Sequence, residues 1–153
     1  MKRKSDSIGT ISKSLLKAQT EIGKVSKDGY NPHFKSKFAD LTSVIEAIKK
    51  PLNENEICFL QLVDISEDAS DKLPFVETVL LHESGEWISS RTPVYCTKPN
   101  NPQALGTGIS YAKRYALQAI MGLPTEDDDG NAASGAPVSN NQTPVNNNEE
   151  FGL

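Results

Sequence analysis

Apolar residues near the start of the chain recur at helical spacing, which predicts an amphipathic helix over about residues 8–27. Ser5, Asp6 or Ser7 can cap its start, and Gly29 is placed to end it. The stripe is nearly heptad but runs for less than three heptads, which favours a helix packed on a domain over a coiled coil. A contact between subunits is the alternative. The apolar residues of this stripe are Ile8, Ile11, Leu15, Ala18, Ile22 and Val25.

A loop is predicted over residues 29–39, where aromatic residues alternate with His33, Lys35 and Lys37. Asp40 can then cap a second helix over about residues 41–50. Pro51 ends that helix or opens a further turn, because proline lacks the backbone N–H that a helix interior needs.

Three strands are expected next, over about residues 56–65, 74–82 and 87–96, because each run is rich in apolar and β-branched residues. A polar loop joins the first two, and a tight turn over residues 83–86 joins the last two. Such short connections predict an antiparallel meander. Pro93 suggests that the third strand has an exposed edge or a bulge.

The last predicted element is a long helix over about residues 102–121, with Asn101 as its cap, Pro102 in its first position, and Gly122 and Pro124 at its end. Gly106 and Gly108 each cost about 1 kcal/mol inside a helix. That cost is tolerable where a strand, a neighbouring subunit or a phosphate approaches the backbone closely.

Taken together, these elements predict an α+β fold, in which a long helix packs on a three-stranded antiparallel sheet and two helices precede the sheet. We expect two regions in the 153-residue chain: a domain over residues 1–125 and a tail over residues 126–153. The tail is acidic and rich in Asn, so it has too few apolar residues to offset its chain entropy, and disorder is expected there.

Charge is distributed unevenly along the chain, although the net charge is only −4. Residues 1–50 and 98–125 carry net charges of +6 and +3, whereas residues 51–97 and 126–153 carry −7 and −6. The two basic segments could form one patch that binds a polyanion, or the charges could be ordinary surface scatter.

Several classes of function find little support in the sequence. No P-loop, Gly-x-Ser-x-Gly or His-Glu-x-x-His motif is present, and the only histidines are His33 and His82. A calcium loop over the acidic run at residues 126–129 would need ligands at Thr125 and Ala136, which cannot supply them. We therefore expect no enzyme activity, no metal and no cofactor. Two cysteines, no apolar membrane span and no secretory signal favour a reducing cytoplasm.

The pairing of cations with aromatic residues favours single-stranded DNA as a partner, because cations follow phosphates while aromatic faces accept bases. Such pairs occur around Lys35 and Lys37 and again around Lys113 and Arg114. The aromatic residues could instead belong to the core, and the cations could simply be solvated. The candidate DNA-binding residues are Lys35, Lys37, Arg91, Lys98, Gln103, Thr107, Tyr111, Lys113 and Arg114.

Three stretches resemble the Erf (essential recombination function) family of bacteriophage single-strand annealing proteins. They are residues 31–41, the hairpin at 77–88 and, most specifically, residues 102–117 with their Ser-Tyr-Ala-Lys-Arg-Tyr run. The acidic residues 127–131 match the stretch that follows in the family. Two departures from the pattern are visible: Phe38 replaces a commoner tyrosine, and Asn55-Glu56-Ile57 stands where many members have a glycine followed by an apolar residue.

The resemblance implies a β-β-β-α core, ring or helical homo-oligomers, and ATP-independent annealing of complementary strands during phage recombination in the host cytoplasm. It also implies that the protein acts together with an exonuclease and a host single-strand binding protein, either of which could bind the acidic tail. The alternative is a passive protein that binds and protects single strands without annealing them. A metal nuclease is a third class, which strand cleavage with added magnesium or manganese would reveal.

Overall fold

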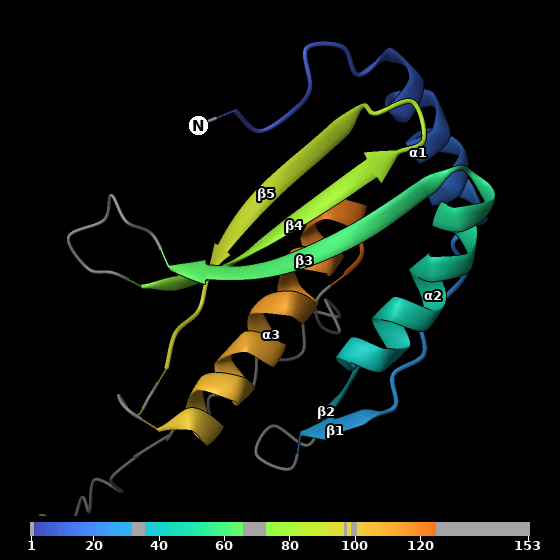
Figure 1. Cartoon of the computed structure of the whole chain (residues 1–153). Coiled ribbons are helices and arrows are strands. Elements are labelled where there is room, and N and C mark those ends of the chain that lie inside the picture. Colours follow the sequence, from blue (N-terminus) through green and yellow to red (C-terminus); the bar gives the residue numbers. More distant parts are fainter. Residues whose placement is uncertain (1, 32–35, 66–72, 97, 99–100, 125–153) are drawn as a thin grey trace, which may run out of the picture.

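The computed structural model describes residues 2–31, 36–65, 73–96, 98 and 101–124. A three-stranded sheet carries helices on one of its faces, and a small hairpin lies beside the second helix (Figure 1). The elements are α1 (Gly9–Glu21), β1 (Gly29–Asn31), β2 (Ser36–Phe38), α2 (Leu41–Glu54), β3 (Ile57–Ile65), β4 (Pro74–His82), β5 (Trp87–Pro93) and α3 (Pro102–Met121). The predicted α+β class is confirmed.

The sheet has the order β3-β4-β5 with antiparallel pairing throughout, as predicted. Gly85 supplies the positive φ of 82° that the tight β4–β5 turn requires. The third strand is shorter than expected and ends at Pro93 rather than Cys96. Proline cannot donate to the ladder, and the chain beyond it leaves the sheet toward α3.

Successive side chains along each strand point to opposite faces of the sheet, so one face packs against the helices and the other face is open. On β4, Val76, Thr78 and Leu80 are buried toward the helices. The core cluster on that side joins Leu80 to residues of all three helices, including Ile11, Ile48 and Leu117. Residues at the odd positions of β4 and their partners on β5 therefore point away from α3.

The long helix has the predicted bounds and the predicted cap. The Asn101 side chain accepts a hydrogen bond from the backbone N–H of Ala104 at 3.0 Å, and Gly122 ends the helix with a φ of 69°. Gly108 is needed because a Cβ there would lie 2.5 Å from the Tyr95 carbonyl oxygen. At Gly106, by contrast, a Cβ would have no atom of the described residues within 4 Å.

The first helix is shorter than predicted, and its cap comes from elsewhere. It ends at Glu21, and Ile22 is extended, yet Ile22 and Val25 still pack against the core. The Glu86 carboxylate in the β4–β5 turn accepts hydrogen bonds from the N–H groups of Thr10 and Ile11, at 2.7 and 2.8 Å. Only tertiary structure can bring a cap from 75 residues away. The predicted local residue Ser7 contributes as well, because its hydroxyl accepts from the Gly9 N–H at 3.4 Å.

The segment between the first two helices also differs from prediction. Residues expected to form a loop include the paired strands β1 and β2. The second helix runs through Pro51 to Glu54, because Pro51 and Leu52 are both buried in the core. Asp40 caps it as predicted, with its side chain accepting from the Ser43 N–H at 2.8 Å.

Candidate nucleic-acid interface

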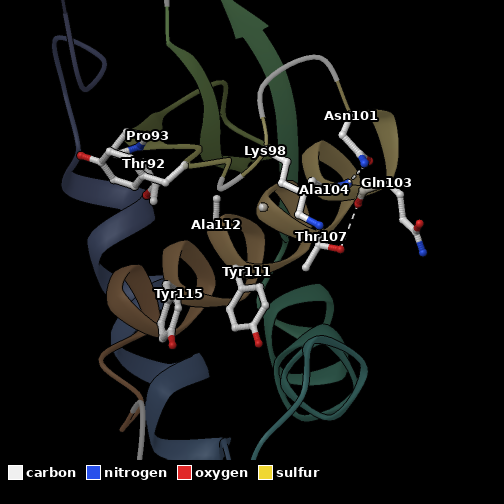
Figure 2. Close-up of a pocket in the computed structure, with 12 residues that line it drawn as sticks. Thr92, Pro93, Lys98, Asn101, Gln103, Ala104, Thr107, Tyr111, Ala112 and Tyr115 are labelled. Carbon is white, nitrogen blue, oxygen red and sulfur yellow. Dashed lines mark hydrogen bonds between the residues drawn. The ribbon is translucent and has the colours of Figure 1, made fainter.

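A cleft of about 660 Å³ opens between the first half of α3 and the chain that leaves β5 (Figure 2). Four of the predicted DNA-binding residues line it: Lys98, Gln103, Thr107 and Tyr111. Its other lining residues are Thr92, Pro93, Tyr95, Asn101, Ala104, Gly108, Ala112 and Tyr115.

The close contact at Gly108 shapes this cleft. Because α3 carries no side chain there, the backbone at Tyr95 can pass against the helix. The chain then continues past Lys98 to the cap at Asn101, so one wall of the cleft comes from this connection and the other from α3. On α3, the Thr107 hydroxyl donates to the Gln103 carbonyl at 3.0 Å, which fixes its orientation.

Three tyrosines line the cleft. Tyr111 is 52% exposed, and its ring stacks on that of Tyr115 with centroids 6.2 Å apart. Tyr95, which is 73% exposed, contributes from the opposite wall. Among the described residues that line the cleft, Lys98 is the one cation. Such a surface can stack unpaired bases and contact one phosphate.

Arg114 does not lie in the cleft, although the sequence suggested a phosphate contact. Its side chain is buried, with 7% of the residue exposed. The guanidinium carbon lies 4.6, 5.2 and 4.7 Å from the ring centroids of Phe38, Tyr111 and Tyr115. Nη1 also donates to the Ala39 carbonyl at 3.4 Å. Arg114 therefore joins the β1–β2 hairpin to α3 and packs against the rings of Tyr111 and Tyr115.

The neighbouring carboxylate of Asp40 is held in its charged form. Hydrogen bonds from the backbone N–H and the hydroxyl of Ser43 lower the pKa of Asp40, and the nearby charge of Arg114 adds to this effect.

Arg91, a predicted DNA-binding residue, lies away from the cleft. It lies on the open face of the sheet, because its partner Glu77 alternates with Thr78, which faces α3. Arg91 is ion-paired with Glu77 at 3.3 Å, and its guanidinium lies 4.2 Å from the Phe75 ring centroid. Strand alternation thus separates Arg91 from the cleft by the thickness of the sheet.

Of the remaining predicted cations that the structure describes, Lys113 and Lys37 are not among the residues that line the cleft. Lys113 lies about 200° around α3 from Tyr111, and its carbonyl accepts from Gln61 of β3 at 3.0 Å. Lys37 is exposed on β2, and Lys35 falls outside the described residues. Within one copy, the described cations Arg91, Lys98 and Lys113 therefore do not line a single groove.

Sequence reasoning did not single out Tyr95, and it left open whether Tyr115 accepts bases or belongs to the core. The signal for Tyr95 was its position, since it follows Pro93 where the strand can no longer pair. Periodicity cannot place a residue that lies outside a regular element.

The described part of the chain holds neither a candidate metal site nor a candidate membrane span. No three His, Cys, Asp or Glu side chains gather there in a way that could hold a metal ion. No described helix is both long and apolar enough to cross a membrane. The acidic run at 126–129 lies outside the described residues, as does the predicted tail.

Comparison with known proteins places the chain in a family. No curated protein and no solved structure gave a significant match. The model of the ERF superfamily matches residues 11–151, which is most of the sequence and includes both walls of the cleft. The chain therefore belongs to the ERF superfamily, a family of phage recombination and single-strand annealing proteins that are generally not enzymes.

Proposed function

We propose that this protein binds single-stranded DNA in the cleft between β5 and α3 and anneals complementary strands without ATP. The observation that carries the proposal is the position of Tyr95, Tyr111 and Lys98 around one opening. Membership of the family indicates the class of protein, and the residues that line the cleft have side chains suited to binding single-stranded DNA.

A single strand fits this cleft better than a duplex does. A base can stack on the exposed face of Tyr111 only if it is not already stacked between neighbours in a helix. The cleft volume of about 660 Å³ lies within the range of pockets that enclose small ligands. We infer that one copy holds one or two nucleotides there.

The scarcity of cations suits a protein that must release its strand. With one lysine in the cleft, each copy contributes few phosphate contacts, so strong binding needs several copies along the strand. Bases between successive clefts stay free to pair with a second strand. Base stacking of about 1.4 kcal/mol per step then drives annealing.

The aromatic lining also gives the passive alternative a specific basis. Bases held on Tyr111 and Tyr95 cannot pair, so a strand with most of its bases held in this way would be protected rather than annealed. The two functions differ in the sign of their effect on duplex formation.

Labelled complementary strands mixed without ATP separate these functions. We expect the full chain to accelerate duplex formation, and Tyr111→Ala to weaken strand binding by about 1–3 kcal/mol, roughly 5- to 150-fold. Tyr30→Ala is the matched control, because Tyr30 is exposed but does not line the cleft. A slower rate with the wild-type chain would establish the passive function, and equal effects of both variants would exclude the cleft.

The wider setting follows from the family. We propose that the protein acts as a homo-oligomer, a ring or a helical filament, in the cytoplasm of the infected or lysogenic host. Residues 126–153 carry six acidic residues and no basic ones, which suits docking to a single-strand binding protein or an exonuclease.

A further inference from the structure

One edge of the main sheet has no partner among the described residues. The strand order β3-β4-β5 leaves the outer edge of β3 unpaired along nine residues, from Ile57 to Ile65. The opposite edge is different, since the backbone of Arg3 and Ser5 pairs with β5 at Ser89 and Trp87. An unpaired strand of this length offers a row of N–H and C=O groups to another chain.

Exposed aliphatic side chains lie along this edge on both faces of the sheet. Leu60 and Leu62 are 45% and 54% exposed on the open face of the sheet. Val63 and Ile65 are 46% and 56% exposed on the helix face, beyond the area that α3 covers. No other described strand combines an unpaired edge with exposed aliphatic side chains on both of its faces.

The sequence of β3 is complementary to itself in one antiparallel register. If two copies pair about Gln61, Leu60 lies opposite Leu62 of the second copy, and Phe59 lies opposite Val63. The acidic Asp64 then lies opposite Cys58, so no carboxylate faces another. A shift by two residues in one direction puts Asp64 opposite Leu60, and in the other direction puts it opposite Glu56. Shifts by one residue would turn one sheet over.

We propose that two copies of this chain pair through the outer edges of their β3 strands, in antiparallel register about Gln61, to form one six-stranded sheet. A second copy satisfies both the backbone edge and the apolar faces, whereas a polar or charged partner would leave four aliphatic side chains unmatched. The cleft lies at the β5 side of the sheet, so both clefts remain open in this dimer.

Thiol cross-linking tests this register in the full chain without DNA. In a Cys96→Ser background, Asp64→Cys places a new thiol opposite Cys58 of the second copy. The two thiols of one chain lie six residues apart on β3, roughly 20 Å, so they cannot bond within a copy. We expect a reducible covalent dimer under mild oxidation, and loss of most of it when Leu62→Glu is added.

Glu46→Cys in the same background is the matched control, because Glu46 is exposed on α2 and away from β3. Equal cross-linking of the two variants, or cross-linking that Leu62→Glu leaves unchanged, would overturn the proposal. Circular dichroism checks that each variant remains folded.

Light scattering gives a second and independent measurement. Leu60→Glu with Leu62→Glu should at least halve the mass in solution, while Leu16→Glu, at a leucine on α1 that is 65% exposed, should not change it. A full-length monomer that dimerises only after deletion of residues 126–153 would show that the tail covers β3, and would also overturn the proposal. Both measurements leave the cleft unaltered, so they fail independently of the proposed DNA binding.

Discussion

The guanidinium of Arg114 lies 4.6 Å from the centre of the Phe38 ring and so ties the β1–β2 hairpin to the long helix. This contact relates two stretches that resemble the Erf family separately in sequence. It also explains why a basic residue next to exposed tyrosines is itself buried: its charge is shared among three aromatic faces.

Arg114→Ala should therefore destabilise the fold by about 2–4 kcal/mol, because it removes the cation–π contacts and leaves a cavity among three rings. Denaturant unfolding measures this loss. Arg114→Lys should recover only part of it, because an ammonium group cannot stack as a planar guanidinium does. If the Arg114→Ala protein is instead stable, and the slope of log affinity against log salt concentration becomes shallower by about 0.7, Arg114 is a phosphate contact.

Two glycines of α3 form a matched pair for testing the close approach at Tyr95. Gly108→Ala should destabilise the protein, because its Cβ would lie 2.5 Å from a backbone oxygen that cannot move freely. Gly106→Ala should stabilise it by about 1 kcal/mol through helix propensity, because that side of the helix is open. Thermal unfolding of both variants provides the comparison. Equal shifts in the two would mean that Tyr95 does not pack against Gly108.

Glu86 makes the docking of α1 depend on pH. Hydrogen bonds from the Ser7 hydroxyl and then from the Ile11 N–H lower the pKa of Glu86 below its ordinary value of 4.5. Because the folded pKa is depressed, this contribution is complete above pH 4.5 and is lost as the pH falls through the lowered value.

Glu86→Gln keeps one acceptor oxygen but removes the titration. The difference in stability between wild type and Glu86→Gln should therefore shrink as the pH falls below 4.5, and unfolding curves over that range measure it. A difference that stays constant over the same range would contradict the capping role.

Glu56 occupies a backbone conformation that normally favours glycine, with a φ of 61°. This is the position at which the sequence departs from the family's common glycine. Glu56→Gly should relieve the strain but lose the 3.5 Å contact with His82, whereas Glu56→Ala should lose the contact and keep the strain. The glycine variant should therefore be more stable than the alanine variant by about 1 kcal/mol in denaturant unfolding. Equal stability would show that the backbone is unstrained there.

The sheet and the long helix could be predicted because local signals set their bounds. Asn101, Pro102 and Gly122 mark the ends of α3, and strand patterning places β3, β4 and β5 closely. The cap at the start of α1 and the hairpin at Gly29 could not be predicted in this way. A capping carboxylate 75 residues distant and an aromatic ring packed over a glycine are tertiary contacts that periodicity does not encode.

The candidate site was predicted on one face of α3 and, outside that helix, at Lys98. Gln103, Thr107 and Tyr111 share a face of α3, so helical spacing placed them together correctly. Arg91 and Lys113 were grouped with them by charge alone, and charge does not indicate on which side of a sheet or helix a residue lies. Tyr95 lies on an irregular connection and gave no periodic signal.

Photocross-linking shows most directly which residues of the protein contact single-stranded DNA. A single strand carrying halogenated uracil, irradiated with the full-length protein and digested, reports which peptides touch the bases. Our account predicts cross-links in the peptides that contain Tyr111 and Tyr95. Cross-links confined to the open face of the sheet, at Arg91 or Trp87, would contradict it.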